Sequence, residues 1–150
     1  TVCKLRPVSR GSCHVASADA FAPPSIQPNY LGAPEDLQTM IAAVKVGRRV
    51  AADPALAALI SAEYDPGPAC ASDAHIEAFI RAKAFSVYHP VGTCAMGPDG
   101  VVDPALRVRG VEALRVIDAS IMPAIVSGNT NAAAIMIGEK GADLVLQDAR

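Results

Sequence analysis

The stretch VYHPVGTCAMG at residues 87–97 is the most informative part of this chain of 150 residues. It carries His89 in a loop whose proline fixes one backbone torsion and whose glycines permit tight turns. A second loop, SGNTNA at residues 127–132, contains Asn129 and leads into a helical pattern. The two loops therefore present one imidazole and one carboxamide on backbone that proline and glycine hold in defined turns.

Three helices are predicted upstream of the first loop, because apolar residues recur there at helical spacing. The pattern that starts at Asp36 ends at Asp53, since the following Pro54 disfavours helical geometry in the residue before it. Asp53 can then cap a second helix, and Ser72 or Asp73 can cap a third. The apolar residues expected to face the core are Leu37, Met40, Ile41 and Val44 in the first helix, Leu56, Leu59 and Ile60 in the second, and Ile76, Phe79 and Ile80 in the third.

The N-terminal residues have a strand-like pattern instead. Residues 2–6 and 12–16 alternate apolar and polar side chains, as strands with one buried face do. Residues 7–11 between them favour a turn, so the pattern predicts a β-hairpin. Residues 21–34 contain four prolines and should form an extended surface connection.

Short apolar runs follow the His89 loop. Residues 101–102 and 106–108 are strand candidates, and residues 114–117 have the uninterrupted apolar character of a buried strand. Asp118 lies at the C-terminal end of that predicted strand.

A long helix is predicted over residues 131–147. Its polar side chains form one narrow stripe, so most of the helix should be buried. Gly138 and Gly141 each cost a helix about 1 kcal/mol relative to alanine, which indicates close approach of another backbone. The polar stripe consists of Glu139, Lys140, Asp143 and Gln147.

Composition excludes several classes of protein. The net charge is -2, lysine and arginine are scattered, and tryptophan is absent, which argues against nucleic-acid binding. No run of about 18 apolar residues occurs, so we expect a soluble protein without a transmembrane helix. The four cysteines lack a C-x-x-C motif, and we expect buried reduced thiols with no metal site.

Length and motifs together predict an incomplete enzyme. A chain of 150 residues fits one ordinary domain, and no Gly-x-Gly-x-x-Gly motif is present to hold a dinucleotide. The chain begins at Thr1 without an initiator methionine or a targeting segment. We therefore expect a C-terminal piece of a longer, cytoplasmic protein.

Several sequence blocks resemble, in order, the C-terminal region of the glucose-methanol-choline (GMC) flavin oxidoreductases, particularly the choline-dehydrogenase-like branch. They cover almost the whole chain, although Ala95 stands where that branch often has a basic residue. The blocks are RPVSRG at 6–11, PNYL at 28–31, the His89 loop, VDPALRV at 102–108, and residues 114–123 with 127–140.

The resemblance implies an α+β fold. Residues 1–110 would form a substrate-binding portion, namely an antiparallel sheet with packed helices and the catalytic histidine loop. Residues 111–150 would supply a return strand at 114–118 and a helix at 131–147, which complete an FAD-binding α/β domain. The N-terminal dinucleotide-binding part of that domain would be a missing partner region.

The resemblance also implies a reaction, the oxidation of an alcohol to an aldehyde or ketone by base-assisted hydride transfer to N5 of FAD. His89 matches the family's base, and an imidazole can accept and release a proton near neutral pH. Asn129 matches the second active-site position, where a carboxamide can donate to the substrate oxygen without titrating. The alcohol and the electron acceptor stay open.

Four residues would contact FAD by the same resemblance. Asp118 and Ala119 would meet the ribityl-phosphate portion, while Asn131 and Ala132 open a helix aimed at the isoalloxazine. A helix N-terminus carries about half a positive elementary charge, which would favour an anionic reduced flavin.

Other interpretations remain open for these residues. Asn129, Asn131 and Asp118 are also common turn and cap residues. A serine hydrolase would use Ser127, His89 and Asp118, but the glycine positions of a Gly-x-Ser-x-Gly elbow are not glycine here. A non-catalytic binding module is a further alternative. Structural roles are expected for His14 and His75, and Cys94 should be core filler.

Overall fold

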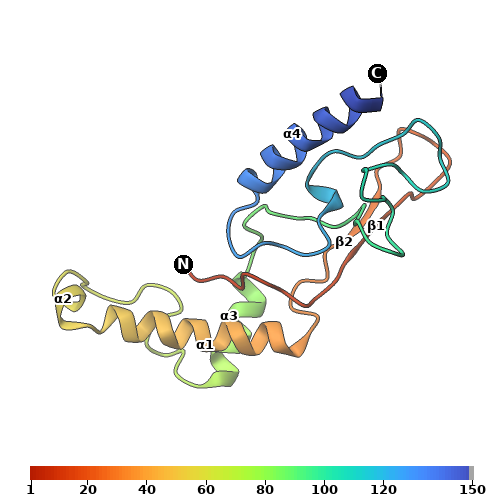
Figure 1. The fold of residues 1–150 in the computed structure, drawn as a ribbon. Helices are drawn as coiled ribbons and strands as arrows, with labels where there is room; N and C mark the ends of the chain where they lie inside the picture. Colours follow the sequence, from red (N-terminus) through yellow and green to blue (C-terminus); the bar gives the residue numbers. More distant parts are fainter. Residues whose placement is uncertain (149–150) are drawn as a thin grey trace. The chain divides into compact units, whose positions relative to one another are not determined.

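The computed structural model describes residues 1–148, which form two compact units, and the chain passes from the first to the second between Ser86 and Val87 (Figure 1). Helices and one small antiparallel sheet make up the regular structure, in agreement with the predicted α+β class. These two units are defined by how their residues pack. The predicted division after residue 110 instead separates residues on the substrate side from residues that complete the FAD-binding domain, and it stays a prediction. The elements are β1 (Ser12–His14), β2 (Ser25–Gln27), α1 (Pro34–Ala51), α2 (Pro54–Ala57) and α3 (Asp73–Lys83) in the first unit, and the 3-10 helix η1 (Ala119–Ile121) and α4 (Asn131–Asp148) in the second.

The first predicted helix is confirmed as α1. It starts at Pro34, two residues earlier than the apolar pattern indicated, because proline suits the first turn, where its missing N–H is not needed. Acidic residues occupy its first turn and Arg48 and Arg49 its last, so both ends complement the helix dipole.

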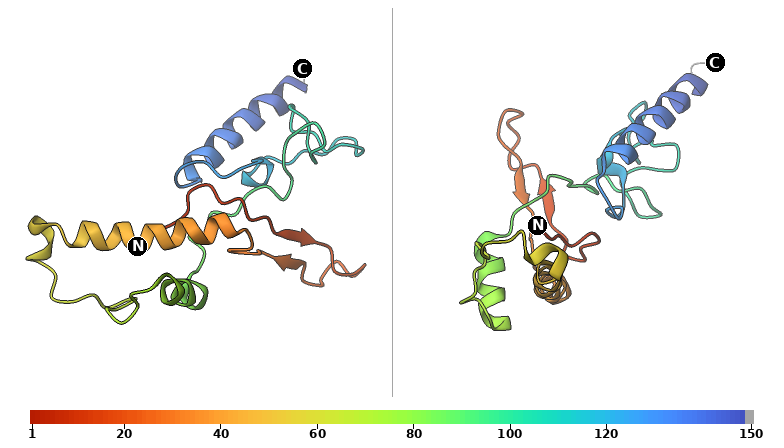
Figure 2. Two further views of the ribbon diagram at one scale, coloured as in Figure 1. Left: turned by 90° about the horizontal axis from the view of Figure 1, so that it is seen from below. Right: turned by 90° about the vertical axis from the view of Figure 1, so that its left-hand side faces the viewer.

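The core of the first unit lies between α1 and α3, which pack together and cross one another (Figure 2). Ser72 accepts a hydrogen bond from the backbone N–H of His75, which confirms it as the cap of α3. Leu37 and Ile41 of α1 pack with Ile76 and Ile80 of α3, as their spacing predicted.

The second predicted helix is much shorter than expected. Asp53 does cap it by accepting from the backbone N–H of Ala55, but α2 ends at Ala57. Leu56, Leu59 and Ile60, predicted to be buried, are exposed, and Leu59 is 81% exposed. One turn of helix is too short to hold an apolar stripe against another element.

The predicted hairpin of residues 2–6 with 12–16 is wrong. β1 pairs instead with β2, with Cys13 opposite Ile26, and both strands are exposed on both faces. The partner strand lies within the proline-rich segment 21–34, where composition suggested only an extended connection. The Asn29 side chain joins the residues that flank the two strands, because it donates to the carbonyl of Arg10 over 2.9 Å.

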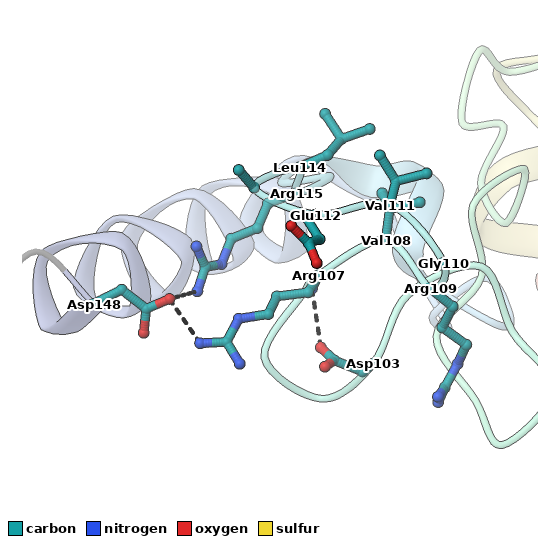
Figure 3. A pocket seen from close by; sticks show the side chains of 11 residues that line it. Asp103, Arg107, Val108, Arg109, Gly110, Val111, Glu112, Leu114, Arg115 and Asp148 are labelled. Carbon is teal, nitrogen blue, oxygen red and sulfur yellow. Dashed lines mark hydrogen bonds and ion pairs between the residues drawn. The ribbon is translucent and has the colours of Figure 1, made fainter.

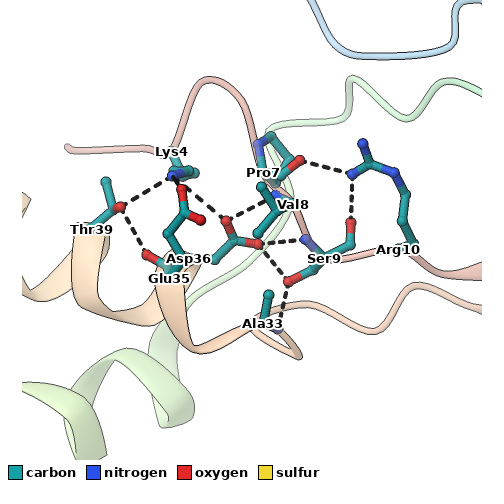
Figure 4. A network of polar contacts seen from close by, with 9 residues as sticks. All are labelled: Lys4, Pro7, Val8, Ser9, Arg10, Ala33, Glu35, Asp36 and Thr39. Carbon is teal, nitrogen blue, oxygen red and sulfur yellow. Dashed lines mark hydrogen bonds and ion pairs between the residues drawn. The ribbon is translucent and has the colours of Figure 1, made fainter.

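Residues 4–9 pack against the start of α1 rather than forming the first predicted strand, and the buried carboxylate of Asp36 holds them there (Figure 4). Its two oxygens accept from the backbone N–H groups of Val8, at 3.0 Å, and Ser9, at 2.8 Å, and from the Ser9 hydroxyl. Lys4 lies 3.8 Å away. Burial raises the pKa of Asp36, but the hydrogen bonds from Ser9 and Val8, helped by Lys4, outweigh it and hold that pKa below its ordinary value.

In the second unit, Val102, Leu106, Ile121, Met122 and Ile137 form the core. Residues 114–117 do not form the predicted regular strand, because within the described residues only the bridge between Arg107 and Arg115 pairs that segment. Leu114 is exposed. Isolated bridges, rather than a ladder, also join residues 96, 102 and 108.

The last predicted helix is confirmed as α4, but it is not mostly buried. Ile137 and Gly141 face the core, whereas Ile135, Met136 and Leu146 are exposed. Gly141 lies against the side chain of Ile117 rather than against backbone, and the position of Gly138 is open. An apolar pattern indicates which surface of a helix can be buried. Residues 1–148 cover only the side of α4 that carries Ile137 and Gly141.

Two further observations bear on composition. Among residues 1–148, none of the helices combines the length and apolar character needed to cross a membrane. Cys70 is buried and Cys94 half-buried, but Cys3 and Cys13 are exposed, so the expectation of buried thiols is wrong for these two. Both exposed cysteines belong to the N-terminal region that lacks the predicted hairpin.

Candidate active site

The loop that carries His89 is fixed by backbone contacts within the second unit. The backbone N–H of Cys94 donates to the carbonyl of Ser120 over 3.0 Å, and that of Met96 donates to the carbonyl of Ile121 over 2.8 Å. Gly92 has a φ of +93°, and a Cβ there would lie 3.2 Å from the carbonyl oxygen of Met122. Glycine at this position thus lets the loop approach the 120–122 segment closely.

His89 is joined to the second predicted loop by Thr130. The Thr130 hydroxyl lies 2.9 Å from Nδ1 of His89. Thr130 is 8% exposed, and its carbonyl accepts the backbone N–H of Ala134, the first helical hydrogen bond toward α4. Nothing in the sequence distinguishes Thr130 as a partner of His89, because a threonine before a helix is ordinarily interpreted as a cap.

Asn129 and Asn131 flank Thr130, and both are exposed, as is Ala132. The structure thus brings the 127–132 loop to His89 through the threonine between the two asparagines. The two asparagines are exposed, so another molecule can reach them.

Asp118 has a local structural role in this chain. Its Oδ1 accepts the backbone N–H of Ser120 over 2.7 Å and caps η1, of which Ala119 is the first residue. Hydrogen bonds from Ser120 hold the pKa of Asp118 below its ordinary value. This is the turn role that the sequence left open for Asp118.

The serine-hydrolase alternative is disfavoured by the same contacts. In a catalytic triad the carboxylate bonds to Nδ1 of the histidine. Here Nδ1 of His89 is bonded to Thr130, while Asp118 is bonded to Ser120.

A cavity of about 560 Å³ lies elsewhere in the second unit (Figure 3). Arg107 and Arg115 both donate to Oδ2 of Asp148 over 2.6 Å, and they hold the pKa of that carboxyl below its ordinary value. The lining contains three arginines and three carboxylates, so its positive and negative charges are equal in number. None of the predicted site residues lines it, so it is not the candidate site. Its lining residues are Asp103, Arg107, Val108, Arg109, Gly110, Val111, Glu112, Ala113, Leu114, Arg115 and Asp148.

The geometry of the His89 region suits an acid–base group next to an electron-rich ligand. The backbone N–H of Ala134 donates to the carbonyl of Thr130, and the N–H groups that precede it have no partner within a helix, as at the start of any helix. Such N–H groups and the helix dipole favour a negatively charged or electron-rich partner. The exposed start of α4 is thus linked through Thr130 to the imidazole of His89.

Comparison with known proteins identifies close relatives. The family model of the GMC oxidoreductases matches residues 7–138. The chain is 51% identical to the alcohol dehydrogenase [acceptor] of Pseudomonas putida, over 97% of this chain and 27% of that protein. It is 50% identical to the mitochondrial choline dehydrogenase of Homo sapiens, over 94% of this chain and 24% of that protein. The chain thus spans about a quarter of the length of the curated relatives it matches.

A solved structure shows the same fold. An FAD-dependent oxidoreductase from Chaetomium thermophilum superposes with a TM-score of 0.91 at 31% sequence identity. The superposition covers 97% of this chain and 26% of the other.

Proposed function

The chain belongs to the GMC oxidoreductase family, and on that basis we propose that it forms the C-terminal catalytic part of an FAD-dependent alcohol dehydrogenase or oxidase. Relatives with about half of their aligned residues identical act on alcohols by name, and one of them acts on choline. The substrate class is therefore an alcohol, which the enzyme oxidises to an aldehyde or ketone.

The observation that carries this proposal is the contact between the His89 loop and the start of α4. The Thr130 hydroxyl lies 2.9 Å from Nδ1 of His89, and the exposed Asn129 directly precedes Thr130 in the chain, which supports a shared role for His89 and Asn129. A base and a neutral donor on neighbouring loops are what removal of a hydroxyl proton needs.

In the proposed reaction, His89 accepts the hydroxyl proton of the alcohol. Asn129 donates from its carboxamide to the same oxygen, and this hydrogen bond strengthens as alkoxide charge develops. When bound, FAD supplies the acceptor for the hydride that leaves the alcohol carbon. The protein residues thus orient the alcohol and hold its proton, and the redox chemistry belongs to the cofactor.

Four residues would contact FAD. Asn131 and Ala132 stand at the exposed start of α4, whose positive end suits the electron-rich ring system. Asp118 and Ala119 would meet the ribityl-phosphate portion through the turn that Asp118 caps. The described residues fit FAD as one wall of its site, since no glycine-rich dinucleotide loop lies in this sequence.

The proposal extends to the division of the chain. Residues 1–110 would bound the substrate side, and residues 111–150 would complete the domain that binds FAD. Residues 114–118 would become a strand only when a neighbouring strand pairs with them, which accounts for their irregular pairing within this chain.

The test is anaerobic reduction of the bound flavin in the complete protein. Mixing the oxidised holoprotein with primary alcohols or choline should bleach the flavin absorbance in a saturable manner. Binding of FAD without bleaching by any alcohol would favour the non-catalytic binding module. Absence of FAD from the complete protein would overturn the proposal.

A further inference from the structure

Thr130 stands at the position before α4, where a threonine hydroxyl commonly accepts a backbone N–H of the first helical turn. In this structure the hydroxyl lies instead 2.9 Å from Nδ1 of His89. The residue is buried, so water competes little for that contact. A buried contact between a hydroxyl and one named ring nitrogen restricts both the orientation of the ring and the position of its proton.

We infer that Thr130 is a positioning residue that accepts a hydrogen bond from Nδ1–H of His89 and thereby leaves Nε2 as the nitrogen that takes the substrate proton. The inference rests on the proposed function, in which His89 is the base. A neutral imidazole carries one proton on its two nitrogens, so only the tautomer with the proton on Nδ1 has a basic Nε2.

If Thr130 accepts the hydrogen bond, its contact with His89 is compatible with both the neutral and the protonated imidazole. Before proton transfer, Nδ1–H donates to Oγ1 of Thr130. After Nε2 has taken a proton, Nδ1 still carries its hydrogen, and the same bond persists without rotation of either side chain. A hydroxyl that donated to Nδ1 would instead keep the proton on Nε2 and would have to turn away when the ring became charged.

The hydroxyl also links the base to the helix that the proposal places at the flavin. Because the carbonyl of Thr130 accepts from the N–H of Ala134, its backbone is fixed by the first turn of α4. Thr130 therefore ties the ring of His89 to the start of that helix, between Asn129 and Asn131. A shift of α4 would move the imidazole with it.

The experiment uses the complete holoprotein with ¹⁵N-labelled histidine, at a pH above the titration range of histidine. The ring signals of His89 are identified by their loss in His89→Gln. We expect a protonated Nδ1 and a bare Nε2 in the unaltered protein, and in Thr130→Val a shift toward the Nε2–H tautomer that free histidine prefers. A bare Nδ1 in the unaltered protein would overturn the inference.

Flavin reduction kinetics give the second measurement. Thr130→Val should lower the rate constant of flavin reduction about 10-fold with little change in alcohol binding, a part of the 10²-fold to 10⁴-fold that general-base catalysis contributes. Thr130→Ser keeps the hydroxyl and should stay within about threefold of the unaltered protein. The matched control is Thr39→Val, an exposed threonine of α1, which should leave the rate unchanged.

The two hypotheses fail in different ways. Equal losses in Thr130→Val and Thr130→Ser, or an unchanged tautomer and rate in Thr130→Val, would reject the role of Thr130 alone. Undiminished flavin reduction in His89→Gln would instead reject the proposed base, whatever Thr130 does to the ring.

Discussion

Gly141 lies directly against Ile117, so closely that a Cβ on the glycine would be 2.1 Å from Cγ2 of that isoleucine. Gly141→Ala should therefore push α4 away from the core or force the isoleucine off its rotamer. Overpacking of this kind costs about 1–3 kcal/mol, more than the roughly 1 kcal/mol that alanine gains over glycine in a helix. We expect a lower free energy of unfolding, measured by denaturant titration with circular dichroism.

Gly138 provides the matched control on the same helix. A Cβ there meets no other atom within 4 Å, so Gly138→Ala should stabilise the chain by about 0.5–1 kcal/mol through helix propensity alone. Equal destabilisation by both substitutions would show that the contact with Ile117 is not the reason for glycine at position 141.

His89→Ala tests the proposed base. Removing the imidazole should slow flavin reduction by alcohol about 10²-fold to 10⁴-fold, because the hydroxyl proton loses its acceptor. FAD should stay bound, since His89 is not among the residues proposed to hold it. Anaerobic stopped-flow absorbance measures the rate, and unchanged kinetics would remove His89 from this role.

Asn129 should act in the transition state more than in substrate binding. Asn129→Ala should lower the rate constant of flavin reduction more than it weakens alcohol binding, since the donated hydrogen bond strengthens with alkoxide charge. Asn129→His restores a donor and should retain more activity than the alanine variant. A raised KM with an unchanged kcat would assign Asn129 to uniform binding instead.

Local signals allowed α1, α3 and α4 to be predicted, and they located the start of α2 but not its length. Ser72 and Asp53 cap helices through contacts within three residues, and the apolar spacing that starts at Leu37 needs no distant partner to be recognised. The pairing of Cys13 with Ile26 was missed because pairing depends on contacts across the chain, and prolines masked the second strand.

Local motifs also led to the candidate site residues, but not to the contact that links their two loops. His89 and Asn129 lie in recognisable motifs, but the structure links the two loops through Thr130, whose side chain has two possible partners. A residue before a helix can cap it or turn to another loop, and packing decides between them. The extent to which α4 is buried likewise depends on what packs against it, which an apolar pattern does not reveal.

Acid should loosen the N-terminal segment through Asp36. The pKa of this carboxyl is lowered in the folded protein, so its contribution to stability is present above its unfolded pKa and is lost as the pH falls through the folded pKa. Asp36→Asn should lower the free energy of unfolding by about 1.5–3 kcal/mol near neutral pH, since hydrogen bonds to a charged group are lost. The difference from the unaltered protein should shrink in acid.

Glu35 is the matched control for Asp36. Its exposed carboxylate lies 3.4 Å from Lys4, and exposed ion pairs contribute little. Urea unfolding of the two variants at neutral and acidic pH should therefore show a pH-dependent loss for Asp36→Asn alone. The same profile in Glu35→Gln would point to general charge effects and not to the Asp36 contacts.

The isolated chain should neither bind FAD well nor oxidise alcohols. Residues 118–132 offer one wall of the proposed site, and this sequence contains no Gly-x-Gly-x-x-Gly motif to hold the pyrophosphate. We expect a dissociation constant for FAD no tighter than about 1 mM, near -4 kcal/mol. A titration followed by flavin fluorescence measures it, and micromolar binding with alcohol-dependent bleaching would prove this prediction wrong.

The same chain should self-associate through α4. Ile135 and Leu146 are 59% and 60% exposed and extend an apolar surface along the side of the helix that does not face Ile137. Exposed apolar patches larger than a few hundred Å² are unusual in soluble monomers. Light scattering should show oligomers that Ile135→Glu with Leu146→Glu reduces, whereas Val15→Glu, at an exposed valine outside the strands, should not. If the unaltered chain proved to be a monomer, the exposed apolar side of α4 would be stable in water. The apolar pattern of this helix would then need a different explanation.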